Sequence, residues 1–404
     1  MSTSSDSPVA RTLGEQLQPA AVVIGAGPAG LATAACLSRL GVQACVLERA
    51  ANVGASWRAH YRRLHLHTVK ELSALPGLGF PDHAPRYVPR AQVVQYLESY
   101  AAHFGIRPHF GVQALRIERL PGGAGWAVVC DDGRRIEAPH VIVATGANAH
   151  PRLTALPGEE IFTGTVTHSH AYRDPVPFAG QRVLVVGMGN TGAEIALDLC
   201  EAGVEVALSV RSAVNMVHRD VLGRPTQRTS ILLGRLPPRL GNTVARWLRN
   251  LTVGDLSRFG LRTPRASPLA QLREEGRTPV IDIGTLARIR AGDIRVHPGI
   301  ERLHATGVQF VDGQQARFDA VVLATGYEAG LQALVPGVEL GLDARGLPRE
   351  AIGLPDGSGR AGLHFTGFDL RQPGGLLRTI AEQAQEVARA VAREVAREVA
   401  TEMG

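Results

Sequence analysis

Cysteine is scarce in this chain of 404 residues: only Cys36, Cys45, Cys130 and Cys200 occur, and none forms a C-x-x-C pair. This argues against a zinc site and a redox-active disulfide, and favours small buried residues. No apolar run reaches the roughly 20 residues of a membrane span, and the first residues lack the hydrophobic core of a secretion signal. We therefore expect a cytoplasmic protein with a disordered tail over residues 1–19.

Lysine is almost absent, since Lys70 is the only one, and nearly all of the positive charge behind the formal net charge of +6 comes from arginine. No basic run is interleaved with aromatic residues, as a nucleic-acid groove would require, so we expect no nucleic-acid partner. The hydrophobic fraction of 45% is ordinary for a globular protein. The length allows two or three domains.

A glycine loop opens the ordered part of the chain. The segment AAVVIGAGPAG predicts a strand that enters a tight turn and then a helix. Its glycines let the backbone approach a pyrophosphate, which the free N–H groups of the helix N-terminus receive. Glu48 ends the next predicted strand and is placed to accept ribose hydroxyls. This loop (Gly25, Gly27 and Gly30) predicts a dinucleotide site that suits FAD.

A second loop of the same kind follows the apolar run Val183 to Val186, with glycines at Gly187, Gly189 and Gly192. Two glycine loops of this type on one chain imply that it binds two dinucleotides. The second strand of this unit ends at Val210, Arg211 and Ser212, where an NAD site would carry an acidic residue. Arginine can instead pair with a 2′-phosphate, so NADPH is favoured over NADH.

The residues just before the second loop have the pattern F-x-G-x-x-x-H-x-x-x-Y, formed by Phe162, Gly164, His168 and Tyr172. Here the sequence resembles the class B flavin monooxygenases, whose identifying motif this is. Within that family it is most similar to the plant YUCCA-type enzymes and their bacterial relatives. Further matching segments include VLERA, YRRLHLHTVKELSALP, ATGANA, RTPVIDIGTLARIRAGDIRVHPGI and VVLATGY, and together they cover most of residues 20–330.

The resemblance implies an α/β fold with two Rossmann-like domains, the NADPH domain inserted into the FAD domain. On this basis we expect FAD-binding segments at 20–160 and 291–404, the latter with a C-terminal helix, and an NADPH-binding domain at 161–290. The implied flavin contacts are Gly25, Gly27, Gly30, Glu48, Trp57, His67, Val112 and Thr145. The implied NADPH contacts are Gly187, Gly189, Asn190, Gly192, Arg211 and Ser212.

Three residues are expected at the reaction centre. Alignment on Lys70 places His67 at the flavin C4a edge, where amine-oxidising relatives carry asparagine, and this departure weakens the case for carrying over their substrate class. His168 and Tyr172 are expected to organise the interdomain linker and the NADP⁺ position rather than to act as acid or base. Tyr172 and Arg173 also stand where Baeyer–Villiger enzymes typically have Trp-Pro or Phe-Pro, which disfavours a dedicated role of that kind.

The implied reaction is an NADPH- and O₂-dependent oxygenation through a flavin C4a-hydroperoxide. The flavin supplies the difficult chemistry, so no catalytic triad is needed. The candidate substrates are a 2-oxo acid such as indole-3-pyruvate, a thioether or an amine. Many family members are dimers, and a homodimer is compatible with the sequence.

Two other functions fit parts of the sequence. The glycine loops would serve a reductase or oxidase that does not oxygenate equally well, but the Phe162 to Tyr172 motif argues against it. A redox-sensing protein that holds FAD and NADPH without turnover is the alternative from another class. A membrane-surface role for residues 229–262 is disfavoured, because Pro237, Pro238 and Gly241 should break an interfacial helix.

The remaining segments give coarser expectations. Residues 87–105 predict an amphipathic helix, and residues 52–71 an irregular loop. Residues 219–277 show little periodicity and are expected to form irregular helices and loops that cover a substrate entrance. The turns Ala144 to Gly146 and Ala324 to Gly326 repeat one motif, and each should return the chain from one nucleotide-binding unit to the other. From Gly374 onward, valines at every fourth position predict a capping helix.

Overall fold

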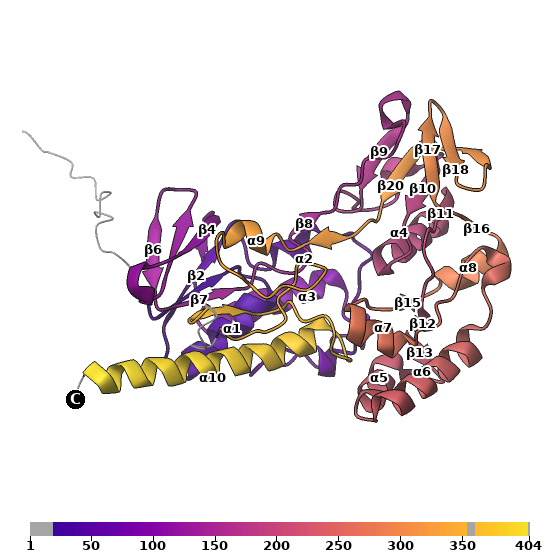
Figure 1. Cartoon of the computed structure of the whole chain (residues 1–404). Helices are drawn as coiled ribbons and strands as arrows, with labels where there is room; N and C mark the ends of the chain where they lie inside the picture. Colours follow the sequence, from indigo (N-terminus) through magenta and orange to yellow (C-terminus); the bar gives the residue numbers. More distant parts are fainter. Residues whose placement is uncertain (1–18, 354–359, 403–404) are drawn as a thin grey trace, which may run out of the picture.

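The computed structural model describes residues 19–353 and 360–402, so residues 1–18 of the predicted tail lie outside the described residues. Its core consists of two parallel five-stranded sheets, which confirms the predicted α/β class (Figure 1). None of the helices in the described ranges combines the length and hydropathy that a bilayer span requires.

The first sheet has the strand order β22-β7-β1-β2-β3, with every neighbouring pair parallel. Helix α1 follows β1 directly, and the chain returns to the sheet at β2, as the first glycine loop predicted. The strands are continuous apolar runs because a parallel sheet is covered on both faces. The bounds are β1 (Ala21–Ile24), α1 (Pro28–Arg39), β2 (Ala44–Glu48), β3 (His109–Phe110), β7 (His140–Val143) and β22 (Leu363–Phe365).

The second sheet has the order β16-β11-β10-β20-β9, again all parallel. The expected return to the first unit at residue 291 is wrong, because β16 and β20 both pair within this sheet. Each unit has a buried apolar strand before an Ala-Thr-Gly turn, and the sequence does not say which sheet either strand joins. The bounds are β9 (Thr165–His168), β10 (Arg182–Val186), α4 (Asn190–Glu201), β11 (Glu205–Ser209), α8 (Thr285–Ala291), β16 (Ile294–His297) and β20 (Ala320–Leu323).

Each unit also carries a small antiparallel sheet of three strands between its parallel strands. These are β4 (Ala114–Arg119), β5 (Trp126–Cys130) and β6 (Arg135–Ala138) in the first unit, and β17 (Ile300–His304), β18 (Gly307–Phe310) and β19 (Gln315–Arg317) in the second.

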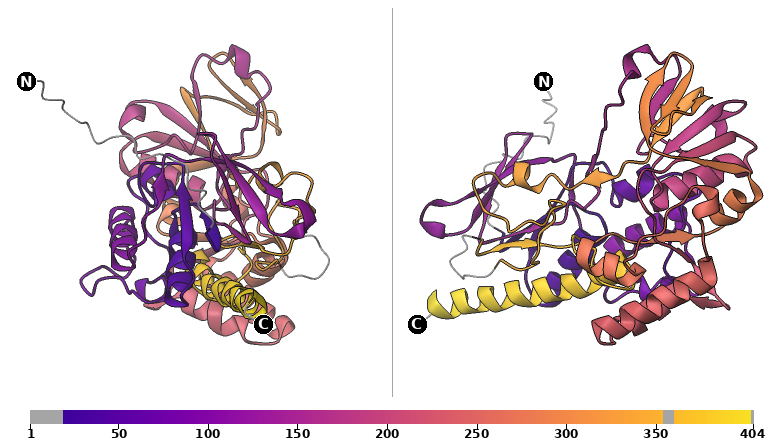
Figure 2. Two further views of the ribbon diagram at one scale, coloured as in Figure 1. Left: turned by 90° about the vertical axis from the view of Figure 1, so that its left-hand side faces the viewer. Right: turned by 45° about the vertical axis from the view of Figure 1, so that its right-hand side comes forward.

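The two linkers between the units lie side by side. β8 (His150–Pro151) pairs antiparallel with β21 (Tyr327–Glu328), directly after the two Ala-Thr-Gly turns (Figures 1 and 2). The turns are equivalent in detail: Ala144 N–H donates to the Ile24 carbonyl, and Ala324 N–H donates to the Val186 carbonyl. The predicted repeat of these turns, and their place at the crossings, is therefore confirmed.

Residues 219–277 are more regular than predicted. Helix α6 (Pro238–Val253) buries Gly241, Ala245, Arg249 and Val253, one residue every four. Gly241 does not break this helix. A Cβ there would lie 2.6 Å from the Leu233 carbonyl oxygen, so glycine allows close packing on the preceding helix. This buried face of α6 is hard to recognise in the sequence because one of its four residues is arginine. The neighbouring elements are β12 (Met216–His218), β13 (Asp220–Val221), β14 (Arg224–Pro225), α5 (Thr226–Gly234), α7 (Pro268–Glu275) and β15 (Val280–Asp282).

The C-terminal helix α10 (Leu376–Glu402) lies along α1 under the first sheet, as Figure 1 shows. Val387 and Val391 are fully buried, whereas Val399 is 47% exposed, so the predicted valine stripe caps the core only over its first part. The predicted helix over 87–105 is α3 (Arg90–His103). The remaining short elements are α2 (Ala55–Ala59), α9 (Leu331–Leu334), η1 (Lys70–Leu72), η2 (Pro121–Gly123), η3 (Glu159–Ile161), η4 (Val176–Phe178) and η5 (Ser257–Phe259).

Candidate active site

The first glycine loop is packed so closely that side chains are excluded. Gly25 has φ +108°, and a Cβ on it would lie 2.6 Å from the Ala144 carbonyl oxygen. A Cβ on Gly30 would lie 1.8 Å from the Gly25 carbonyl oxygen, where α1 crosses the loop. Gly27 differs, because nothing lies within 4 Å of its Cβ position and no side chain caps the helix there. The N-terminus of α1 is thus open to an anion.

Glu48 and Thr145 flank this loop. Glu48 is 7% exposed, and its carboxylate accepts hydrogen bonds from Ala26 N–H at 2.7 Å and Ala50 N–H at 2.9 Å. Two backbone donors leave further lone pairs for ribose hydroxyls. The Thr145 hydroxyl is buried and has no hydrogen-bond partner among the described residues. Such an orphaned group in a dinucleotide cradle fits a bound FAD.

Two other predicted flavin contacts lie close to this cradle. Val112 is buried, and its N–H already donates to the Glu48 carbonyl, so only its other backbone and side-chain atoms remain for a ligand. Trp57 lies on α2, partly buried against the core of the first unit. Its ring contacts His60 edge-on, with 6.2 Å between the ring centroids.

The second glycine loop repeats the first. A Cβ on Gly187 would lie 2.7 Å from the Ala324 carbonyl oxygen, and a Cβ on Gly192 would lie 2.0 Å from the Gly187 carbonyl oxygen. Gly189 is again the open, uncapped N-terminus of its helix, α4. Asn190 is engaged in the protein itself: its Oδ1 accepts from Ile281 N–H at 2.7 Å, and its Nδ2 donates to the Pro279 carbonyl at 3.3 Å. Asn190 thus ties the loop to β15.

Arg211 and Ser212 lie exposed just beyond β11. The Arg211 carbonyl accepts a hydrogen bond from Arg262 Nη2 at 2.5 Å, which brings a second cation to this corner. Arg262 could not be predicted from the sequence, because it is distant in the chain and belongs to a loop without a motif. Arginine is the side chain best suited to a phosphate, and both Arg211 and Arg262 belong to this corner.

The F-x-G-x-x-x-H-x-x-x-Y motif is spread over several contacts. A Cβ on Gly164 would lie 2.6 Å from the Phe162 ring, so this pair is a packing unit. His168 ends β9, accepts from His170 N–H through Nδ1, and contacts the Tyr327 ring of the second linker edge-on. Burial lowers the pKa of His168, and its Nε2 has no partner among the described residues.

Tyr172 lies away from the linker that His168 contacts. Its hydroxyl donates to Asp198 of α4 at 2.8 Å, and its ring meets Tyr61 edge-on, with 6.3 Å between centroids. Burial, with Asp198 as a further cause, raises the pKa of Tyr172 far above its usual range. Tyr172 therefore remains a protonated donor that joins α4 to the loop around residue 61.

His67 contacts the second unit directly. Its Nε2 lies 2.6 Å from Oε1 of Glu194, a residue of α4 whose side chain is only 2% exposed. Burial and the charge of Glu194 raise the pKa of Tyr61 well above its usual range, so this carboxylate serves two residues of the first unit. Glu194 was not among the residues predicted from the sequence. The only available signal was an acidic residue in the apolar run AEIALDL.

The same helix holds this loop at two further points. Arg63 pairs with Glu201 and lies 3.8 Å from Asp198. Glu194, Asp198 and Glu201 follow one another at helical spacing, so a single acidic face of α4 contacts the loop. We call Glu194, Asp198 and Glu201 the acidic row. It joins the nucleotide-binding helix of the second unit to the His67 loop of the first.

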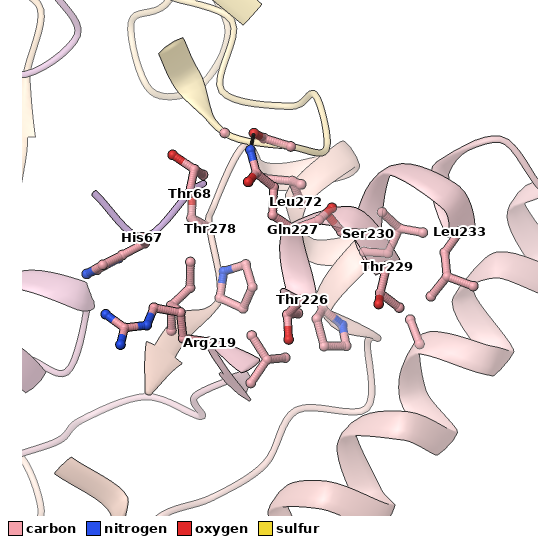
Figure 3. Close-up of a pocket in the computed structure, with 18 of the residues that line it drawn as sticks. His67, Thr68, Arg219, Thr226, Gln227, Thr229, Ser230, Leu233, Leu272 and Thr278 are labelled. Atoms are coloured by element: carbon pink, nitrogen blue, oxygen red, sulfur yellow. Dashed lines mark hydrogen bonds between the residues drawn. The ribbon is translucent and has the colours of Figure 1, made fainter. Parts of the chain in front are cut away.

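A cavity of about 290 Å³ opens beside His67, between its loop, helices α5 to α7 and the segment before α10 (Figure 3). Its wall is mainly apolar, with polar side chains at several points. Gln227 joins two segments of the cavity wall: its side chain accepts a hydrogen bond from Val69 N–H at 2.8 Å and donates one to the Gly374 carbonyl at 2.5 Å. The apolar lining includes Val217, Leu233, Leu248, Leu269, Leu272 and Ile281. Such a cavity suits a small organic ligand.

Comparisons with known proteins agree with this geometry. A family profile described as pyridine nucleotide-disulphide oxidoreductase matches residues 22–227. Indole-3-pyruvate monooxygenase YUCCA1 of Oryza sativa subsp. japonica is 38% identical over 367 residues, covering 90% of this chain and 89% of the relative. Indole-3-pyruvate monooxygenase YUCCA6 of Arabidopsis thaliana is 39% identical, covering 87% of this chain and 85% of the relative.

A solved structure agrees as well. The flavin-containing monooxygenase from Stenotrophomonas maltophilia superimposes with a TM-score of 0.71 at 25% identity, covering 94% of this chain and 99% of the other. The fold and the two loops define a pyridine-nucleotide-dependent flavoprotein oxidoreductase. Within that class, the chain belongs to the YUCCA-type family of flavin monooxygenases. It is an NADPH-dependent monooxygenase, and its cofactors are FAD and NADPH, as predicted.

Proposed function

We propose that the first unit binds FAD, that the second binds NADPH, and that a 2-oxo acid such as indole-3-pyruvate is oxygenated in the cavity beside His67. The observation that carries this proposal is the position of the cavity. Its wall contains His67 and Thr68 of the first unit together with Val217 and Ile281 of the second, and His67 also contacts Glu194 of α4. A substrate there would lie beside His67, the proposed flavin contact. The relatives named for indole-3-pyruvate suggest the substrate class.

The connectivity supports an NADPH domain inserted into an FAD domain. All strands of the first sheet come from residues up to 143 or from 363 onward, and all strands of the second from 165 to 323. In this proposal, Gly25, Gly27, Gly30, Glu48 and Thr145 hold FAD, with Trp57 and Val112 at its edges. Gly187, Gly189, Gly192, Arg211 and Ser212 hold NADPH, with Asn190 supporting the loop.

The chain's own residues have three tasks in the reaction. Bound FAD supplies the oxygen chemistry, using hydride from NADPH. The apolar wall of the cavity excludes water, which limits wasteful loss of the reactive oxygen species. His67 is proposed to face the flavin from a position that Glu194 fixes. His168 packs on the second linker, and Tyr172 hydrogen-bonds to α4, so both are proposed to position these elements.

The overall conversion balances as 2-oxo acid, O₂, NADPH and a proton giving the shortened acid, CO₂, water and NADP⁺. The experiment supplies the purified holoenzyme with NADPH, O₂ and indole-3-pyruvate, and measures indole-3-acetate and hydrogen peroxide. Product equal to the NADPH consumed supports the proposal. Peroxide equal to NADPH with every candidate substrate would instead indicate an oxidase. No NADPH consumption would favour a redox sensor. If a thioether were sulfoxidised efficiently and indole-3-pyruvate gave no product, the substrate class would be a thioether instead of a 2-oxo acid.

We further propose a cytoplasmic location and a homodimer. All four cysteines are free, which suits a reducing compartment. The dimer rests on the family resemblance alone, and light scattering of the holoenzyme would test it. A monomeric mass at micromolar concentration would contradict it.

A further inference from the structure

Arg219 belongs to the wall of the cavity beside His67. Figure 3 shows His67 and Arg219 on the same side of the cavity, with Leu233 at the opposite side. The backbone of Arg219 is fixed at two points: its N–H donates to the Asp282 carbonyl, and its carbonyl accepts from Thr226 N–H. The position of the side chain therefore follows from a rigid segment between β12 and β13.

The guanidinium of Arg219 is held in place by one aromatic ring and one carboxylate. It stacks on the Tyr87 ring, with Cζ 4.0 Å from the ring centroid. Oδ2 of Asp220 lies 3.6 Å from Nε, beyond hydrogen-bonding distance, and Oδ1 of the same carboxylate accepts from the Tyr87 hydroxyl at 2.7 Å. The Nε atom is buried without a hydrogen-bond partner among the described residues. Stacking fixes the plane of an arginine while its N–H edge remains available for a carboxylate.

The other cations near the cavity are less suited to this task. Arg249 is buried, and its Nη1 donates to Asn215 Oδ1 and to the carbonyls of Pro264 and Ala266. Arg224 is exposed at the rim, where water screens its charge. Arg219 is therefore the arginine of the cavity wall whose hydrogen-bonding edge is least engaged within the described residues.

We infer that Arg219 binds the carboxylate of an anionic, amphiphilic substrate whose apolar body lies among the leucines of the cavity. The inference deepens the proposed function and rests on it for the site. It makes Arg219 a specificity-determining residue: the enzyme should select organic acids over neutral compounds of the same shape. A bidentate pair with carboxylate also fixes the orientation of the rest of the molecule relative to His67.

The test compares indole-3-pyruvate with its methyl ester, which keeps the shape and removes the charge. Binding to the oxidised holoenzyme is measured without NADPH by flavin fluorescence, and turnover is measured separately. In the unaltered enzyme, we expect the acid to bind more tightly than the ester. In Arg219→Gln, we expect acid binding to weaken about 10- to 100-fold, because a hydrogen-bonded charge pair is lost. Ester binding should change less than about twofold, and Arg219→Lys should recover part of the loss.

Arg239→Gln is the matched control, because it removes the same charge from an exposed position of α6 outside the cavity. Equal weakening of acid and ester in Arg219→Gln would show that Arg219 only supports the fold, and would overturn the inference. A raised KM for NADPH with unchanged acid binding would assign Arg219 to the dinucleotide instead. The binding assay needs no turnover. Suppose that the enzyme releases only peroxide, yet its binding of the acid still depends on Arg219. The proposed oxygenation would then be wrong, whereas the carboxylate site at Arg219 would stand.

Discussion

Nε2 of His67 lies 2.6 Å from Oε1 of Glu194, and this contact joins the first nucleotide-binding unit to the helix that follows the second glycine loop. Glu194 is almost fully buried, and within the described residues its carboxylate faces His67 and Tyr61. A buried carboxylate beside a ring nitrogen favours the tautomer that carries the proton on that nitrogen. Glu194 is thus a positioning residue for His67.

Replacing Glu194 should impair turnover, because it removes the buried carboxylate that lies 2.6 Å from His67. We expect Glu194→Ala to lower kcat about 10- to 100-fold, because an interaction with a charged group is worth about 1.5–3 kcal/mol. Glu194→Gln keeps an acceptor oxygen and should lose less. Steady-state kinetics with the FAD content of each variant determined would measure both effects.

Glu205→Gln is the control, because Glu205 is exposed at the start of β11, away from the cavity. The ¹⁵N chemical shifts of His67 add a readout that a merely structural role would not change: in Glu194→Ala, the Nε2-protonated tautomer should lose its dominance. Unchanged tautomer populations together with lost activity would contradict the positioning role.

Alanine at the two equivalent glycines should separate the two cofactors. In Gly25→Ala, the new Cβ would clash with the Ala144 carbonyl, so the purified protein should contain little FAD. In Gly187→Ala, the clash is with the Ala324 carbonyl, so FAD should stay bound while the KM for NADPH rises at least tenfold. Absorbance at 450 nm and reduction kinetics measure these properties.

The control for backbone strain is Gly203→Ala. Gly203 also has a positive φ of +79°, but nothing lies within 4 Å of its Cβ position. It should therefore show only the cost of about 1–2 kcal/mol for a left-handed residue, with both cofactors retained. If both loop variants lost FAD equally, the assignment of one cofactor to each unit would be wrong.

Arg211 should determine the preference for NADPH. Arg211→Gln removes a cation beside the proposed 2′-phosphate, and we expect the KM for NADPH to rise about 10- to 100-fold. The KM for NADH should change less than about twofold, since NADH lacks that phosphate. Arg295→Gln, which removes an exposed charge from the neighbouring strand β16, is the control. Equal effects on both nucleotides would indicate that Arg211 acts elsewhere.

The sequence predicted the parts of the site that depend on local spacing. Gly25 and Gly187 could be recognised because a tight turn between strand and helix tolerates no Cβ, and this requirement appears as a fixed pattern. Their roles as packed turns are borne out by the structure. The catalytic role of His67 stays a prediction, although the structure does place it beside the cavity.

The contacts between the units could not be predicted in this way. Glu194 and His67 are far apart in the chain, and nothing in either segment indicates the other. Arg219 lies in a stretch without periodicity, and its importance comes from Tyr87 and Asp220, which determine what its guanidinium can still bind. Such pairings depend on how two units pack, which a single sequence does not encode in local patterns.

Two buried histidines predict a loss of stability in acid. His364 of β22 is fully buried, and its Nε2 lies 3.4 Å from Nδ1 of His140 of β7, which is 2% exposed. Burial lowers the pKa of His140 to about 4 and that of His364 to about 3. Glu394 of α10 lies 3.8 Å from His140, and burial raises the pKa of this carboxyl.

The sign follows from proton uptake. An unfolded histidine titrates near pH 6.5, so between about pH 6.5 and 4 the unfolded chain binds protons that the folded protein does not. The free energy of unfolding should therefore fall with decreasing pH, by up to about 1.4 kcal/mol per pH unit for each histidine, while Glu394 offsets part of this near its own pKa. Replacing His364 by phenylalanine keeps a buried ring and removes one titrating group. Urea unfolding of the variant between pH 7 and 4.5 should show a slope shallower by about 1.4 kcal/mol per pH unit. An unchanged slope would mean that these histidines do not govern acid stability.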